Sequence, residues 1–325
     1  MIKAALIGLG WWGQMHIRAT AGSDQIKFVR GIDIAPDNAR EFCAEYGLEL
    51  SSDYNDALND PGIDAVLLAT PHSLHADQIV AAAAAGKHVF TEKPFALKKA
   101  DGERAVAAAQ TAGIQLGLGH NYRYNPALWE IKKLIDSGKL GELHHLEANL
   151  SHDGQLGIDS WRRSADEAPT GGIIHFGAHM IDLLCWFAGE MKEVYGQTAT
   201  HVLDADVGAV LIKFRSGTMG YLADLMATPA TFYFMVMGDK GWARAQGWLD
   251  DAELTVRYIG DDQPQTIDLP PRDVETQIRI NDENFAAACE GTQDYLFTPT
   301  HMAHTAAIQE AIAQSVKSGA PVGIA

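Results

Sequence analysis

The feature that most constrains this chain is a regular alternation along its first 120 residues. Short runs that are apolar throughout are each followed by a stretch with helical periodicity. Strands that are apolar on both faces are typical of a parallel sheet with helices packed on both sides. The pattern therefore predicts a doubly wound α/β domain, with strands at Ala4–Gly8, Ile26–Ile32, Ala65–Ala69, Val89–Thr91 and Ile114–Leu118 and helices at Trp12–Ala21, Pro36–Tyr46, Leu74–Ala85 and Leu97–Ala112.

The pattern of predicted strands and helices changes near residue 122. Asn125 is the expected N-cap of a helix over Pro126–Asp136, and helical patterns return at Val274–Glu290 and Thr300–Lys317. Between them lie longer β-type stretches joined by tight turns, as in an antiparallel sheet. This half is predicted to be an α+β domain on an open, mainly antiparallel sheet, with strands at His144–Leu150, Glu193–His201, Val207–Phe214, Thr218–Leu225 and Thr231–Met237. The expected domain limits are 1–122 and 123–325.

Composition excludes several classes of partner. The 325 residues carry a formal net charge of −17, which repels phosphate backbones and anionic lipid, so neither nucleic acid nor membrane is expected to bind. There is no signal-peptide pattern and no apolar run long enough to span a bilayer. The three cysteines form no C-x-x-C pair and are expected to be buried thiols. The chain is expected to be soluble and cytoplasmic.

A glycine-rich motif, G-x-G-x-x-G, joins the first predicted strand to the first predicted helix. In this context the glycines permit a tight turn, the approach of a pyrophosphate and close helix–strand packing. Helix N-terminal N–H groups then hold the phosphates, which explains how an acidic protein could bind an anion. An acidic residue ending the next strand suits the ribose hydroxyls and favours NAD, although Arg40 could turn toward the extra phosphate of NADP. The expected cofactor-binding residues here are Gly8, Gly10, Trp11, Trp12, Gly13 and Asp33.

Two further segments follow predicted strands at the edge of the sheet where ligands bind in such folds. The first is Ala69-Thr70-Pro71-His72-Ser73-Leu74-His75 and the second is Thr91-Glu92-Lys93-Pro94. Thr70, Pro71, His75, Glu92 and Lys93 are expected to contact the cofactor. Lys93 would also polarise a hydroxyl or handle a proton. An ordinary solvated lysine is the alternative.

The second half contributes a Gly-Gly segment followed by two histidines. If the chain is helical from His175, then His175, His179 and Asp182 lie on one face at spacings i, i+4 and i+7. The alternative to a catalytic role is that these histidines are buried structural residues or cap a helix. A metal site is disfavoured because Phe176 stands where H-E-x-x-H sites carry glutamate. No metal is expected.

Taken in order along nearly the whole chain, these motifs resemble the Gfo/Idh/MocA family of oxidoreductases. Trp161-Arg162 and the Thr298-Pro299 helix extend the resemblance. It implies a Rossmann domain, an open sheet that often mediates oligomers, a lysine near the reacting hydroxyl (Lys93) and a catalytic histidine (His179). The expected reaction is hydride transfer between nicotinamide and a secondary alcohol or ketone of a sugar, polyol or related cyclic compound. The expected substrate-contact residues are Tyr122, Arg123, His152, Trp161, Arg162, His175 and Asp182.

One departure from the family pattern concerns the residue four positions before the catalytic histidine. Family members commonly carry aspartate there, and this chain has His175. Either His175 shares a proton relay with His179, or it contacts an unusual substrate group such as an anionic one.

Two other functions stay open at this point. A lyase or glycosidase-like enzyme could use NAD transiently without net NADH formation. A non-catalytic nucleotide-binding regulator could bind NAD without turnover.

Overall fold

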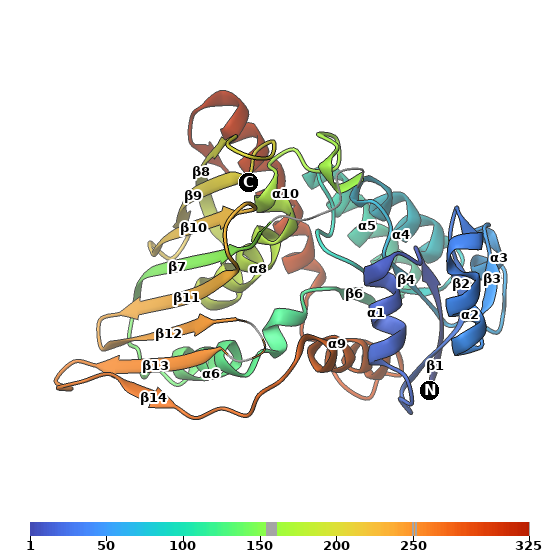
Figure 1. Ribbon diagram of the computed structural model, residues 1–325, viewed down its shortest axis with the longest axis horizontal. Helices are drawn as coiled ribbons and strands as arrows, with labels where there is room; N and C mark the ends of the chain where they lie inside the picture. Colours follow the sequence, from blue (N-terminus) through green and yellow to red (C-terminus); the bar gives the residue numbers. More distant parts are fainter. Residues whose placement is uncertain (154–160, 249, 251, 325) are drawn as a thin grey trace. The chain divides into compact units, whose positions relative to one another are not determined.

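The computed structural model describes residues 1–153, 161–248, 250 and 252–324, and the chain folds into two compact units. The first unit comprises Met1–Asn121 and Glu275–Ala306, and the second comprises Tyr122–Val274 and Ala307–Ala325. Figure 1 shows the helices and strands of both units, many of them labelled. The expected boundary near residue 122 lies beside the observed change of unit. Unlike the expectation, however, residues 275–306 group with the first unit.

The first unit is built on a parallel sheet whose strand order is β3-β2-β1-β4-β5-β6 in the described residues. This is the doubly wound arrangement predicted from the alternation, with the order reversing between β1 and β4. Its strands are β1 (Ile2–Ile7), β2 (Ile26–Ile32), β3 (Glu49–Ser51), β4 (Ala65–Leu68), β5 (His88–Thr91) and β6 (Leu116–Leu118). Its helices are α1 (Trp11–Ala19), α2 (Arg40–Tyr46), α3 (Asn55–Leu58), α4 (His75–Ala84), α5 (Lys99–Ala112) and α9 (Val274–Cys289), with 3₁₀ turns η1 (Pro36–Ala39) and η2 (His72–Leu74).

Helix α9 belongs to the first unit because its apolar side packs into that unit's core. The ring of Phe285 meets Phe90 of β5 edge-on at 5.5 Å between centroids. The amide of Asn281 donates to the carbonyl of Leu118 at the end of β6 (2.9 Å), and the hydroxyl of Tyr295 accepts the Leu118 N–H. These contacts join segments more than 160 positions apart in sequence, which local patterns do not reveal.

The second unit contains a mixed sheet with nine strands in the described residues, in the order β14-β13-β12-β11-β7-β10-β9-β8-β15. Only β7 and β10 pair in parallel there; the other neighbours are antiparallel, in agreement with the predicted open, mainly antiparallel sheet. The strands are β7 (Leu143–Ser151), β8 (Met191–Ala199), β9 (Val207–Phe214), β10 (Met219–Leu225), β11 (Thr231–Gly238), β12 (Gly241–Gly247), β13 (Glu253–Tyr258), β14 (Gln265–Ile267) and β15 (Val322–Gly323).

Helices pack against one face of this sheet (Figure 1). They are α6 (Pro126–Asp136), α7 (Gly172–His175) and α8 (Gly177–Ala188), and residues 307–318 of α10 (Pro299–Ser318) also belong to this unit. The short turns are η3 (Asn121–Tyr124) and η4 (Trp161–Arg163). As predicted, the Asn125 side chain caps α6, accepting the N–H groups of Ala127 and Leu128. Helix α8 is buried on almost every side, as expected for a helix without a polar face.

Two details differ from the sequence-based expectations. The helix expected to run from His175 is interrupted at Phe176, so His175 ends α7 while His179 and Asp182 lie in α8. Strands β3 and β12–β15 were not expected. In β12 small alanines face the core while Trp242, Arg244 and Gln246 alternate with them, a sequence with weak β-propensity that cross-strand pairing stabilises.

The packing of α9 makes a testable prediction at Gly117 in β6. A Cβ atom there would lie 2.6 Å from the Phe90 ring and 2.7 Å from the Phe285 ring. We expect Gly117→Ala to lower the free energy of unfolding by about 1–3 kcal/mol through overpacking. Adding Phe285→Leu should relieve part of this cost, so the double variant should be more stable than the sum of the single effects, measured by urea unfolding. Additive effects would contradict the contact.

Candidate functional site

The glycine loop between β1 and α1 has the geometry that a dinucleotide phosphate site needs. Gly8 has φ +95°, and a Cβ atom there would lie 2.6 Å from the carbonyl oxygen of Ala69. At Gly13 a Cβ would lie 2.1 Å from the Gly8 carbonyl oxygen, so only glycine lets α1 pack this closely on β1. Gly10 is the N-cap of α1, and a Cβ there would meet open space. The helix N-terminus is therefore accessible to an anion, and the residues fit a bound pyrophosphate.

Two tryptophans begin α1. The side chain of Trp11 is 67% exposed, and its ring lies 5.4 Å from that of Trp12, which is only partly exposed. A large exposed aromatic side chain beside Gly10 is an apolar surface at the edge of the phosphate loop.

Asp33 is tied to the glycine loop by its own carboxylate. One oxygen accepts the N–H of Leu9 (2.7 Å), and the other accepts the N–H of Ala35 (2.9 Å). The carboxylate thus stands at the end of β2, directly beside the loop, where a ribose would lie in a Rossmann fold. Arg40 pairs with Asp37 on an exposed part of the surface.

The turns that follow β4 and β5 are linked by His75. Its Nδ1 lies 2.9 Å from the carbonyl oxygen of Pro94, and its Nε2 lies 3.1 Å from that of Thr70. The Thr70 hydroxyl donates to the side chain of Gln78 in α4 (2.6 Å). His75 is fully buried, and its two contacts join the turn after β4 to the turn after β5. Pro71 and Lys93 lie on these turns, and the Lys93–Pro94 peptide is cis.

Beneath Lys93 lies a buried cluster of three ionisable side chains. Nδ1 of His16 lies 2.8 Å from Asp282 of α9, and Nε2 lies 3.1 Å from Glu92. Although burial opposes the charged imidazole, the two carboxylates raise the pKa of His16 to about 10. Burial alone would raise the pKa of Glu92, but the partner His16 lowers it, whereas for Asp282 burial prevails and its pKa is raised. His16 is therefore an imidazolium that keeps Glu92 ionised.

In the second unit, the ring of Tyr122 stacks on that of His179. The centroids are 4.1 Å apart and the planes are inclined by 19°. The next residue, Arg123, donates two hydrogen bonds to Asp182, each 2.8 Å long. Because Asp182 follows His179 by one helical turn, the stack and the ion pair tie η3 to α8 at adjacent points. Burial raises the pKa of Tyr122, so its hydroxyl stays protonated.

The remaining predicted residues of this unit surround α7. Nε2 of His175 donates to the carbonyl oxygen of Arg162 (2.8 Å), which anchors η4 to α7. The guanidinium of Arg162 lies 4.4 Å above the ring of Trp161. The ring of His152 packs against Phe176 at 4.2 Å between centroids. Lys93 belongs to the first unit and His179 to the second, so their action on one substrate stays a prediction.

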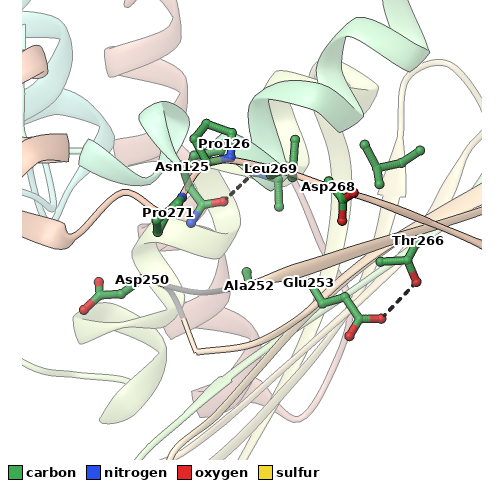
Figure 2. Close-up of a pocket in the computed structure, with 12 residues that line it drawn as sticks. Asn125, Pro126, Asp250, Ala252, Glu253, Thr266, Asp268, Leu269 and Pro271 are labelled. Carbon is green, nitrogen blue, oxygen red and sulfur yellow. Dashed lines mark hydrogen bonds between the residues drawn. The ribbon is translucent and has the colours of Figure 1, made fainter.

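A separate pocket of about 220 Å³ lies between the start of α6 and strands β13 and β14 (Figure 2). Asp250, Glu253 and Asp268 give it an acidic lining, and Figure 2 shows the Glu253 carboxylate turned toward the hydroxyl of Thr266. None of the predicted site residues lines this pocket. Asp250 nevertheless acts on the candidate site through its charge, because it helps to raise the pKa of Tyr122.

Sequence reasoning missed three buried groups: His16, Asp282 and Asp224. Asp224, at the end of β10, is fully buried and lies against Gly172, where a Cβ would be 2.0 Å from a carboxylate oxygen. His16 and Asp282 could have been found from the sequence, because each is an ionisable residue on the buried face of an amphipathic helix. Across the described part of the chain, no group of three His, Cys, Asp or Glu side chains is arranged to hold a metal ion. Nor is any described helix long and apolar enough to cross a membrane.

The His16 cluster predicts a specific dependence of stability on pH. In the unfolded chain His16 loses its proton near pH 6.5, but in the fold it keeps it to about pH 10, so its stabilisation is complete below pH 6.5 and is lost as the pH rises to 10. We expect the unfolding free energy of wild type to fall between about pH 6.5 and 10 relative to His16→Gln, by up to about 1.4 kcal/mol per pH unit. Denaturant unfolding at several pH values measures this difference. Parallel curves for the two proteins would contradict it.

Comparison with known proteins agrees with this geometry. Residues 2–120 match the model of the Gfo/Idh/MocA oxidoreductase family with its NAD-binding Rossmann fold, and residues 128–244 match the model of the GFO/IDH/MocA C-terminal domain. The chain is 27% identical to the uncharacterized oxidoreductase YrbE of Bacillus subtilis, over 99% of this chain and 96% of the relative.

Two further relatives have named activities. The chain is 28% identical to myo-inositol 2-dehydrogenase of Thermotoga maritima, over 68% of this chain and 67% of the relative. It also superposes on a levoglucosan dehydrogenase solved with NADH and L-sorbose, with a TM-score of 0.90, 25% identity and coverage of 100% of this chain and 99% of the other. With a glycine loop shaped for a dinucleotide and both family models matched in tandem, the chain belongs to the Gfo/Idh/MocA family of NAD-binding oxidoreductases.

Proposed function

We propose that this protein oxidises a secondary alcohol of a sugar, polyol or related cyclic compound with NAD⁺, or catalyses the reverse reduction. The observation that carries the proposal is the common edge of the parallel sheet at which the phosphate loop after β1 and Lys93 after β5 both end. That edge is where dinucleotides bind in this fold. The named dehydrogenases among the relatives support the choice of a carbohydrate-like alcohol.

Each protein group has a defined task in this reaction. His179, as neutral imidazole, accepts the proton of the substrate hydroxyl, while the carbinol C–H bond breaks and its hydride leaves. The nicotinamide ring, when bound, supplies the hydride acceptor. Lys93 donates a hydrogen bond to the substrate oxygen and stabilises the negative charge that develops on it. One ketone, one NADH and one proton result from each alcohol and NAD⁺.

Other residues orient His179, favour NAD over NADP or are candidates for substrate contact. The Tyr122 stack and the Arg123–Asp182 pair set the orientation of His179, since both contacts involve the helix that carries it. Asp33 supports NAD over NADP, because its carboxylate would repel a 2′-phosphate. His175, in place of the family's usual aspartate, stays a candidate for proton relay or for contact with an anionic substrate group. Trp161, Arg162 and His152 stay candidates for substrate contact.

A reduction screen tests the reaction. NAD⁺ and NADP⁺ are each offered with sugars, inositols, uronic acids and diols, and absorbance of the reduced cofactor is followed. Net NADH formation with at least one compound supports the proposal. Turnover without net NADH would identify the lyase mechanism instead, and NAD binding without turnover would identify a regulator.

Two substitutions test the catalytic assignments. We expect Lys93→Met and His179→Phe each to lower kcat/KM by about 10²–10⁴-fold, because each removes a group acting on the transition state. Calorimetry should find the affinity for NADH within a few-fold of wild type. Matched controls are Lys98→Met and His144→Phe, which change exposed residues in the same units. Loss of activity in the controls, or full activity in either variant, would contradict the assignments.

We further propose that a second copy of the chain covers the face of the sheet opposite its helices. Neighbouring strands align Tyr195, Leu211, Tyr221, Glu147, Met235 and Arg244 in one row. Adjacent residues such as Ile212, Leu222 and Val236 are buried in the core, so the row points to the other face, where Leu211 is 52% exposed. A mainly apolar row that contains Glu147 and ends at Arg244 suits a two-fold pairing, in which each acid can meet the other copy's arginine.

This pairing predicts that a substitution in the row lowers the mass of the assembly in solution. We expect wild type to elute as a multiple of 35.2 kDa and Met235→Glu to shift toward 35.2 kDa, because the new charge would be buried at the interface. Light scattering coupled to size-exclusion chromatography measures the mass. Val202→Glu, at an exposed site between β8 and β9, is the control. A monomeric wild type would rule the pairing out.

A further inference from the structure

The three groups of the His16 cluster come from three separate elements of the first unit. His16 lies on α1, the helix that follows the phosphate loop, Glu92 follows β5, and Asp282 lies on α9. All three are at most 6% exposed. Both ring nitrogens of His16 face carboxylates, and a neutral imidazole has only one N–H to donate. If both carboxylates are ionised, both contacts can be hydrogen bonds only when the ring is an imidazolium, which carries an N–H toward each carboxylate.

Apolar rings surround this histidine. Phe90 meets it edge-on at 5.6 Å between centroids, and Trp12 meets it at 6.2 Å. Charge–charge attraction is strong in such surroundings because little water screens it. The imidazolium therefore binds the two carboxylates tightly and fixes their positions.

Glu92 has a closely fitting site beside it. A Cβ atom at Gly119 would lie 2.1 Å from Oε1 of Glu92, so any larger residue there would displace the carboxylate. The other oxygen, Oε2, accepts the backbone N–H of Lys93 (3.1 Å). Glu92 is thus held through one oxygen by His16, and through the other it holds the backbone of the lysine.

The charges of the cluster are unequal. One imidazolium faces two carboxylates, and among the described residues Oδ1 of Asp282 has no hydrogen-bond partner. Of the two carboxylates, Asp282 is therefore the one that takes up a proton more readily, since its pKa is raised. The pKa of Glu92 is lowered, so Glu92 keeps its charge beside Lys93.

We propose that His16 is a positioning residue of the active site: it links α1 and α9 to Glu92 and thereby holds the backbone of Lys93 at the end of β5. This inference rests on the proposed role of Lys93. It assigns a function to two ionisable side chains, His16 and Asp282, that are at most 1% exposed.

The test compares three variants by NMR. His16→Gln removes the cation, and Gly119→Ala displaces Glu92 while all three charges remain. The control Lys87→Met removes a buried cation at the opposite end of β5, where its Nζ donates to the carbonyls of Asp60 and Ile63. In protein labelled with ¹⁵N-lysine, the Lys93 amide signal should shift in His16→Gln and Gly119→Ala but not in Lys87→Met. ¹⁵N-histidine labelling should find His16 protonated on both nitrogens at pH 8.

Kinetics with an alcohol found by the screen supply a second readout. His16→Gln and Gly119→Ala should lower kcat by about 10–100-fold, the effect of displacing a catalytic group by about 1 Å. The NADH dissociation constant should stay within about threefold of wild type. Lys87→Met should lose thermal stability but keep kcat.

Three results would overturn the inference: a neutral His16 ring, an unshifted Lys93 amide in His16→Gln, or equal kinetic losses in His16→Gln and Lys87→Met at matched stability. If the screen yields no substrate, the proposed function fails. The NMR comparison still decides whether His16 positions the lysine backbone.

Discussion

The parallel pairing of β1, β4 and β5 is the constraint on which the rest of this molecule depends. Parallel strands end at the same edge, so the segments after them meet although they are separated by scores of residues. That edge receives the glycine loop, the turn containing Thr70 and the turn containing Lys93. The chain has a net charge of −17, and the open N-terminus of α1 offers backbone N–H groups to an anion that the acidic side chains would otherwise repel.

Every candidate reactive group is held by a partner distant in sequence. Glu92 is held by His16, the two turns are joined by His75, and His179 is stacked by Tyr122 while the neighbouring Asp182 is paired with Arg123. These contacts are buried, so their charges and rings act in a medium of low polarity, where electrostatic forces are strong. The reactive groups can then keep one geometry at small entropic cost, which is the general basis of preorganised catalysis.

The sequence predicted five of the six strands described in the first sheet and the glycine loop after the first of them, because apolar strands and glycine spacing are local patterns. It predicted a mainly antiparallel second sheet but missed four of its strands, β12–β15; in β12, alanines alternate with Trp242 and polar residues. The placement of His175, His179 and Asp182 on one helix face was conditional on a helix running from His175, but α7 ends at His175 and α8 begins at Gly177. Periodicity extends across such a break without detecting it.

The sequence by itself therefore determined the alternation of strands and helices in the first unit, the position of the glycine loop and the residue types available for chemistry, since each depends on neighbours only a few positions away. Only the tertiary structure decided that α9 completes the first unit, that Asp282 and Glu92 share one buried imidazolium, and that Asp182 is paired with Arg123. Those pairings join residues 59 to 266 positions apart, and their energies depend on burial, which no local pattern reports.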